Sequence, residues 1–213
     1  MTKLYNRLEK LRVDYFQNDF FLMSKISNNI FIYTENIHDN SGNNFDVEYT
    51  LTIPYECIII SEIEEESHFN HLKINSAPDI ILISKYNNKY KLDILEIKSS
   101  ITNKDLKNMS NKLMGGYLRT VSLLAPLHLD IKCVDLYVAF YSDNNITVNT
   151  ASLSNKILAM HNIPCWKNNE IYLPETIDNK FFNKNNIYIN KLIYQDYRLN
   201  SNSTTITFPR NNI

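Results

Sequence analysis

The chain has 213 residues, of which 44% are hydrophobic and 12% aromatic. It therefore has the size of one domain and enough apolar side chains to bury a core, unlike a disordered chain. Its 22 Lys and Arg residues balance 23 Asp and Glu residues, and the formal charge of −1 argues against a uniformly basic nucleic-acid coat protein.

Cysteine usage and hydropathy indicate the compartment. Cys57, Cys133 and Cys165 are far apart and odd in number, so they form neither a disulfide framework nor a CxxC metal motif. No apolar run approaches the roughly 18 residues needed to span a membrane, and the N-terminus carries no signal-peptide core. We therefore expect an intracellular, cytoplasmic protein with no membrane partner.

The first part of the chain is predicted to form one helix followed by strands. Leu4, Leu8, Leu11 and Tyr15 recur at helical spacing, with polar residues between them. Turn-forming residues then separate two alternating stretches, and Pro54 interrupts the second of these. The predicted helix covers residues 3–23, and the predicted strands cover residues 29–34, 47–53 and 55–63.

The central part is predicted to contain a hairpin, a long helix and another strand. Two apolar runs flank the turn-forming pair Asn87 and Asn88, and a helical pattern follows until Pro126. The predicted elements are strands at 80–84 and 90–97, a helix at 103–124, a strand at 131–141 and a short helix at 152–161. This order predicts an α/β fold with a central mixed sheet flanked by helices. We expect a core over residues 1–150 and a C-terminal extension, residues 151–213, packed on the same domain.

Charged side chains stand at both ends of the predicted hairpin. Asp79 opens its first strand, and Glu96 and Lys98 close the second, where alternation points both toward one face. A tight turn would bring Asp79 opposite Glu96. Two convergent carboxylates suit Mg²⁺, and a neighbouring ammonium can stabilise charge on a phosphate. A solvated Glu–Lys pair at a strand end is the alternative interpretation.

The stretch PDIILIS…YKLDILEIKSS resembles the motif of the PD-(D/E)xK nuclease superfamily, the restriction-endonuclease-like proteins, through Pro78, Asp79, Glu96 and Lys98. The predicted order of elements over residues 1–141 is also similar to that family's core. The resemblance implies a DNA endonuclease in which Asp79 and Glu96 hold Mg²⁺ or Mn²⁺ and Lys98 is the catalytic lysine. The family often adds a glutamate from the first helix. Glu9 is the candidate metal ligand here, with Glu62 as the alternative.

The helix after the motif is predicted to contact nucleic acid. Five basic residues and one acidic residue lie between Lys98 and Arg119, so this segment can meet phosphates. An ordinary solvated helix face is the alternative. Two adjacent glycines in the same helix indicate either a close backbone approach or a kink. The candidate nucleic-acid-binding residues are Lys104, Lys107, Lys112, Tyr117 and Arg119.

Two other functions stay open. One is an RNA endonuclease of the viral cap-snatching type, in which His68 and His71 would be further metal ligands or phosphate contacts. The other is a catalytically inactive nucleic-acid-binding protein on the same core. All three functions have nucleic acid as the expected partner, and DNA is favoured over RNA because the DNA endonuclease is the preferred interpretation. A homodimer is one expected form, because duplex strands are related by symmetry. Trp166 is expected in the core rather than as a platform for base stacking.

Overall fold

The computed structural model describes most of the chain. The described residues are 1–15, 22–26, 29–38, 44–61, 77–86, 88–172 and 186–209. Among them, no helix is long and apolar enough to cross a membrane. Cys57, Cys133 and Cys165 are free thiols.

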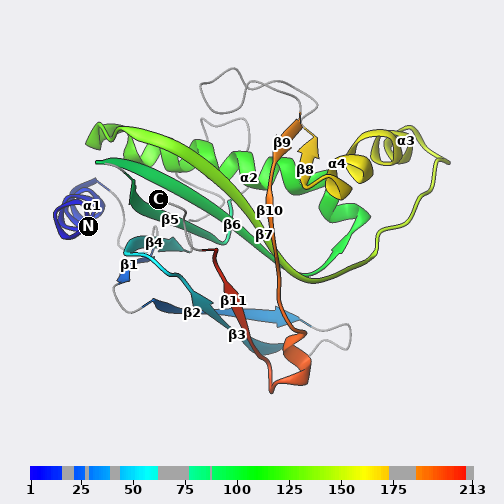
Figure 1. Cartoon of the computed structure of the whole chain (residues 1–213), viewed down its shortest axis with the longest axis horizontal. Helices are drawn as coiled ribbons and strands as arrows, with labels where there is room; N and C mark the ends of the chain where they lie inside the picture. Colours follow the sequence, from blue (N-terminus) through cyan, green and yellow to red (C-terminus); the bar gives the residue numbers. More distant parts are fainter. Residues whose placement is uncertain are drawn as a thin grey trace.

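A mixed sheet of six strands lies at the centre of the described chain, in the order β1-β4-β5-β6-β7-β10 (Figure 1). Neighbours from β1 to β6 are antiparallel, whereas β7 is parallel to both β6 and β10. The parallel pair β6 and β7 is joined by helix α2 (Asn103–Leu124), as a crossover between parallel strands requires. The six strands are β1 (Leu22–Ile26), β4 (Cys57–Ser61), β5 (Ile80–Tyr86), β6 (Lys89–Thr102), β7 (Ile131–Asn145) and β10 (Asn190–Ile193).

Two smaller sheets and several helices complete the described structure. The three-stranded sheet has the order β11-β3-β2, and β8 pairs with β9. These strands are β2 (Ile30–His38), β3 (Asn44–Thr52), β8 (Glu170–Tyr172), β9 (Asn186–Tyr188) and β11 (Ser203–Thr207). The remaining helices are α1 (Thr2–Tyr15), α3 (Leu153–Ile157) and α4 (Ile163–Lys167), with a π-helical turn η2 (Leu158–Asn162) and 3₁₀ turns η1 (Ala125–Leu127) and η3 (Tyr197–Leu199).

Both faces of the central sheet are buried. Helices α1 and α2 cover one face, where Ile81 and Ile94 belong to the apolar clusters that these helices share with the sheet. The three-stranded sheet covers the other face, where Leu82 and Leu95 pack. Figure 1 shows α2 above the central sheet and the smaller sheet below it. Burial on both sides explains why β4 and β5 are almost continuously apolar rather than alternating.

Most predicted elements are confirmed. The β5–β6 hairpin forms with Ile80 opposite Leu95, and α2 has the predicted bounds. The N-terminus of α2 is fixed by a capping box, in which Thr102 accepts a hydrogen bond from the Asp105 backbone and Asp105 accepts one from Thr102. Trp166 is 2% exposed and its ring packs against Phe140, so its predicted place in the core is confirmed.

Several predicted boundaries are wrong: β2 runs to His38 rather than residue 34, β6 runs to Thr102 rather than residue 97, and two further cases have a clear cause. The first helix ends at Tyr15, the last residue with helical spacing, and Met23 lies in β1, paired with Ile60. Strand β7 does not stop at Tyr141 but continues to Asn145, because the long β6 keeps pairing beside it as far as Thr102. Backbone pairing with a neighbouring strand thus overrides the turn preference of residues 142–145.

The C-terminal segment adds strands that the sequence did not indicate. Strand β10 pairs with β7 at one edge of the central sheet, and β11 pairs with β3 at one edge of the small sheet. Strands of four or five residues offer too few positions for a periodic signal. Glu62, His68 and His71 lie outside the described residues.

A buried ion pair lies within the central sheet, away from the predicted motif. Lys91 is 4% exposed, and its Nζ lies 2.9 Å from Asp93 Oδ1 and 2.8 Å from Asp135 Oδ2. The Tyr55 hydroxyl donates a hydrogen bond of 2.8 Å to the other oxygen of Asp93. Burial raises the pKa of Asp93 to about 6 despite these partners. This network joins β6, β7 and the segment before β4.

Candidate active site

The hairpin and α2 together place Asp79 at the end of the central sheet. Its Oδ2 accepts a hydrogen bond of 2.6 Å from the backbone nitrogen of Ile97, across the hairpin. The preceding Pro78 packs against Gly116 of α2, where an added Cβ would lie only 2.6 Å from the proline Cγ. Glycine at position 116 therefore lets α2 approach Pro78 closely. This contact holds Pro78 in place, together with the adjacent Asp79.

Glu96 is the most buried acidic group of the site. It is 0% exposed, and its Oε1 lies 2.8 Å from Lys98 Nζ and 2.7 Å from Lys112 Nζ. The two lysine side chains are 24% and 28% exposed, so both reach the surface. Glu96 Oε2 has no hydrogen-bond partner among the described residues. A buried carboxylate with one orphaned oxygen is costly unless a further partner binds it.

The protonation of the site follows from burial and from mutual repulsion. Desolvation raises the pKa of Asp79 to about 7, and the negative charge of Glu96 adds to this effect, although Lys98 opposes it. Burial alone would lower the pKa of Lys98, but the carboxylates of Glu96 and Asp79 outweigh it and raise that pKa above its ordinary value. Lys98 therefore stays protonated.

Glu35 is a charged residue of this region that the sequence analysis missed. It lies on the inner face of β2, in alternation with the partly buried Tyr33 and Ile37. Desolvation raises the pKa of Glu35, Lys98 opposes this rise, and Glu96 adds to it. The available signal was a carboxylate on the otherwise apolar face of a strand.

The donor set fits a divalent cation bound through two carboxylates. Mg²⁺ is usually held by one or two carboxylates and keeps several waters, and Glu96, with its orphaned Oε2, and Asp79, on which its charge acts, offer such ligands. Within the described ranges, no group of three or more His, Cys, Asp or Glu side chains is close enough to hold a metal. Neither Glu9 nor Glu35 is therefore brought together with Asp79 and Glu96 as a third ligand.

The assignment of Glu9 as a metal ligand stays a prediction, and the contacts that the structure gives Glu9 lie within α1. Glu9 Oε1 forms an ion pair of 2.6 Å with Arg12 on the same helix, and this contact lowers the pKa of Glu9. The periodic face of α1 packs its leucines on the sheet, which directs Glu9 to the more exposed side. The helical period of the sequence predicts which residues of α1 share a face. It does not predict how α1 packs relative to Asp79 and Glu96.

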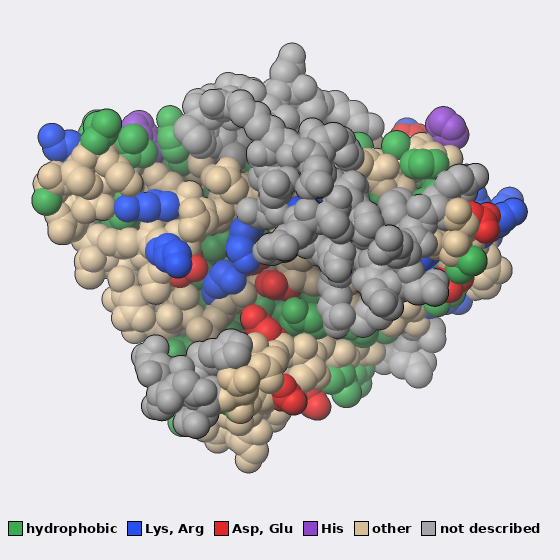
Figure 2. Space-filling model, turned by 180° about the vertical axis from the view of Figure 1, so that it is seen from behind, with side chains coloured by type: hydrophobic (Ala, Val, Ile, Leu, Met, Phe, Trp, Pro, Cys, Tyr) green, Lys and Arg blue, Asp and Glu red, His purple; other side chains and the backbone are tan. Residues whose placement is uncertain are grey.

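The predicted nucleic-acid contacts divide into two groups. Arg119 is 0% and Tyr117 6% exposed, so neither side chain can meet a strand on the surface, and this part of the prediction is corrected. Tyr117 follows the buried Leu113 by four positions and so shares its face. Lys104 and Lys107 are exposed, and Lys107 bonds to Asn155 (3.2 Å). Figure 2 shows basic side chains gathered beside acidic ones on one face of the molecule.

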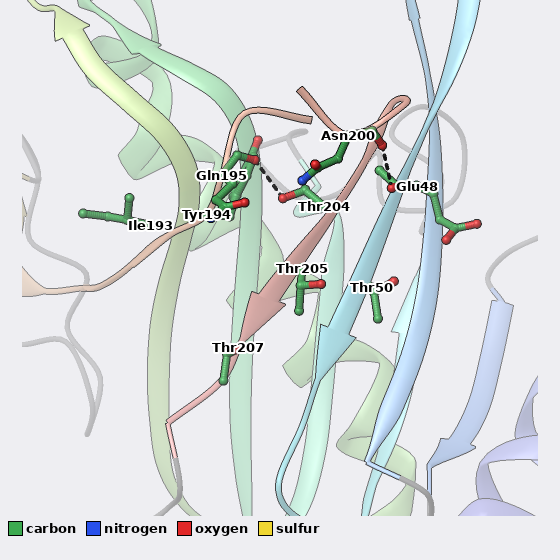
Figure 3. Close-up of a pocket in the computed structure, with 10 residues that line it drawn as sticks. Glu48, Thr50, Ile193, Tyr194, Gln195, Asn200, Thr204, Thr205 and Thr207 are labelled. Carbon is green, nitrogen blue, oxygen red and sulfur yellow. Dashed lines mark hydrogen bonds between the residues drawn. The ribbon is translucent and has the colours of Figure 1, made fainter. Parts of the chain in front are cut away.

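A pocket of about 490 Å³, separate from the site around Glu96, lies between β3, β11 and the segment that precedes η3 (Figure 3). Its side chains are neutral except for Glu48, and Thr204 uses its hydroxyl to bond the Gln195 carbonyl (2.7 Å). The lining comprises Glu48, Thr50, Ile193, Tyr194, Gln195, Asn200, Ser203, Thr204, Thr205 and Thr207. This pocket lacks the paired carboxylates and ammonium groups that distinguish the site around Glu96.

Comparison with known proteins identifies no relative: no family model, no curated protein and no solved structure matches this chain. The function must therefore be argued from the site itself.

Proposed function

We propose that this protein is a metal-dependent nuclease that hydrolyses phosphodiester bonds, with DNA as its substrate, and that it is a divergent member of the PD-(D/E)xK superfamily. The observation that carries the proposal is the state of Glu96. Its carboxylate is fully buried, one oxygen is held by two lysines and the other is orphaned. A purely structural role does not explain why a buried carboxylate in β6 has one oxygen without a hydrogen-bond partner.

The topology also supports the proposal. Strands β4, β5 and β6 form an antiparallel meander, and α2 then crosses to the parallel β7. With α1 on the same side as α2, this is the order of elements expected of the superfamily's core. The proposal puts the chemistry at the end of the hairpin under the crossover helix, and Asp79 and Glu96 lie there.

Each residue of the site has a defined role in this proposal. Asp79 and Glu96 would hold Mg²⁺ or Mn²⁺, which supplies a Lewis acid for a bound water and for the phosphate. Ile97 fixes the orientation of Asp79 through its backbone hydrogen bond. Lys98 carries a proton because its pKa is raised, so it donates hydrogen bonds to phosphate oxygens and stabilises their developing charge rather than acting as a free base.

The test is cleavage of plasmid DNA and of single-stranded RNA in Mg²⁺, Mn²⁺ or EDTA, by the unaltered chain and by Lys98→Ala. Lys132→Ala is the matched control, because Lys132 is exposed and lies six residues before Val138, the partner of Glu96, or about 20 Å along β7. We expect metal-dependent cutting of DNA that Lys98→Ala loses and Lys132→Ala keeps. Tight binding without cutting would replace the nuclease by a binding protein, and a preference for RNA would change the substrate.

A further inference from the structure

A small basic pocket adjoins Glu96 on the side of α2. It has a volume of about 230 Å³, several times the roughly 30 Å³ that a water molecule occupies in the liquid. Its lining residues are Lys98, Lys104, Asp105, Asn108, Met109 and Lys112. Two of its lysines, Lys98 and Lys112, are the ones that contact Glu96, so the pocket and the carboxylate share them.

The charges around this pocket favour an anion. Its one acidic lining residue, Asp105, already accepts hydrogen bonds from the backbone and the hydroxyl of Thr102 at the start of α2. Lys98 and Lys112 hold Glu96, which lies behind the pocket, and their charges also act on Asp79 and Glu35, whereas Lys104 is exposed to solvent. Lysine ammonium groups at this density, beside the N-terminal part of a long helix, suit a phosphate group.

We propose that the pocket of Lys98, Lys104 and Lys112 binds a phosphate group of the substrate strand adjacent to the one that is cleaved, and that Lys112 is exchanged between Glu96 and this pocket. The identity of the ligand as a nucleic-acid strand rests on the proposed function. The exchange rests on the geometry of Glu96 alone.

The movement of Lys112 from Glu96 to the pocket follows from a contact that two lysines share: Lys98 Nζ and Lys112 Nζ both lie against Glu96 Oε1. Two ammonium groups within 2.8 Å of Glu96 Oε1 already neutralise the carboxylate that a divalent cation would use, and their charges repel that cation. When Glu96 takes a cation as its partner, repulsion between like charges drives the ammonium of Lys112 away. Lys112 is part of the pocket lining and reaches solvent, so its ammonium can then turn to the phosphate. Cation and phosphate binding therefore strengthen each other, as linkage requires.

The first experiment measures the anion. Fluorescence anisotropy of a short labelled oligonucleotide in EDTA reports binding without cleavage, at several salt concentrations. We expect Lys104→Gln to weaken binding and to lower the salt slope by about one phosphate contact, whereas Lys132→Gln changes neither. Equal behaviour of Lys104→Gln and Lys132→Gln would overturn the pocket. The competing outcome is displacement of the oligonucleotide by inorganic phosphate at concentrations near the oligonucleotide's dissociation constant. That result would show a site for free phosphate and would overturn the assignment to a strand.

The second experiment measures the cation, by calorimetric titration of the protein with Mg²⁺ alone. Lys112→Gln removes the competing ammonium, so we expect its affinity for Mg²⁺ to rise by about fivefold or more, with Lys104→Gln unchanged. An unchanged or weakened affinity in Lys112→Gln, or no Mg²⁺ binding by any of these chains, would overturn the exchange. Neither experiment reads cleavage, so its result stands apart from the outcome of the nuclease test.

Discussion

Replacing Asp79 by Asn should stabilise the protein while removing a metal ligand. The amide oxygen of Asn can still accept the hydrogen bond from Ile97, so the substitution chiefly removes a charge. The pKa of Asp79 is raised from 3.8 to about 7 in the folded chain, mainly by desolvation. A rise of about three pKa units corresponds to at most about 4 kcal/mol of folding free energy, and relaxation around a partly exposed group reduces this to about 2 kcal/mol.

The sign depends on pH. Because the folded state binds the Asp79 proton more tightly than the unfolded state, ionisation costs stability as pH rises from 3.8 toward 7. The cost is fully present near pH 8 and small near pH 4, so Asp79→Asn should help only at the higher pH. For a chain of this length, about 2 kcal/mol raises Tm by about 4–8 °C.

The assay is thermal unfolding by circular dichroism in EDTA near pH 8 and near pH 4. Addition of Mg²⁺ at the higher pH should then stabilise the unaltered chain, and should stabilise Asp79→Asn much less. Destabilisation of Asp79→Asn near pH 8, or the same shift of Tm at both pH values, would refute the assigned burial and charge of this group.

Three further predictions follow from the fold and the site. Gly116→Ala should lower the free energy of unfolding in urea by about 1–3 kcal/mol, because its Cβ would lie 2.6 Å from Pro78 Cγ. It should also weaken Mg²⁺ binding, because Asp79 would be displaced with Pro78. Unchanged stability and unchanged Mg²⁺ affinity would contradict this packing. Lys91→Met should lower the free energy of unfolding by about 3–5 kcal/mol, because it leaves the Asp93 carboxylate buried without its cation. A second change, Asp93→Asn, should restore part of that stability. Additive effects of the two changes in the double variant would speak against the ion pair. The affinity for Mg²⁺ in calorimetry should fall as pH drops below about 7, because Asp79 must lose its proton to bind the metal; a pH-independent affinity would exclude it as a ligand.

The hairpin motif was predictable because everything it needs is local. Asp79 directly precedes β5 and Glu96 lies in β6, two strands joined by a tight turn, and alternation alone places Glu96 and Lys98 on one face. The helix bounds of α2 were predictable for the same reason, since Thr102 and Asp105 form a local cap and Pro126 ends the pattern.

The rest of the site depends on contacts between distant segments. Glu35 comes from β2 in a different sheet, and no periodic pattern links it to Glu96. Lys112 was predicted to meet phosphates, but its contact with Glu96 requires knowledge of how α2 docks on the sheet. The same docking buries Arg119, whose charge in the sequence indicated a surface position.

The central claim is that Glu96 takes part in metal-dependent hydrolysis, and a single-turnover cleavage assay on labelled duplex DNA with Mg²⁺ tests it most directly. Glu96→Gln keeps the shape of the side chain and removes its charge. Glu48→Gln is the control, because Glu48 is an exposed carboxylate beside the separate pocket of Figure 3. We predict that Glu96→Gln cuts at least about a hundredfold more slowly than the unaltered chain, with Glu48→Gln unaffected. Equal rates for Glu96→Gln and the unaltered chain, or cleavage that persists in EDTA, would contradict the assignment.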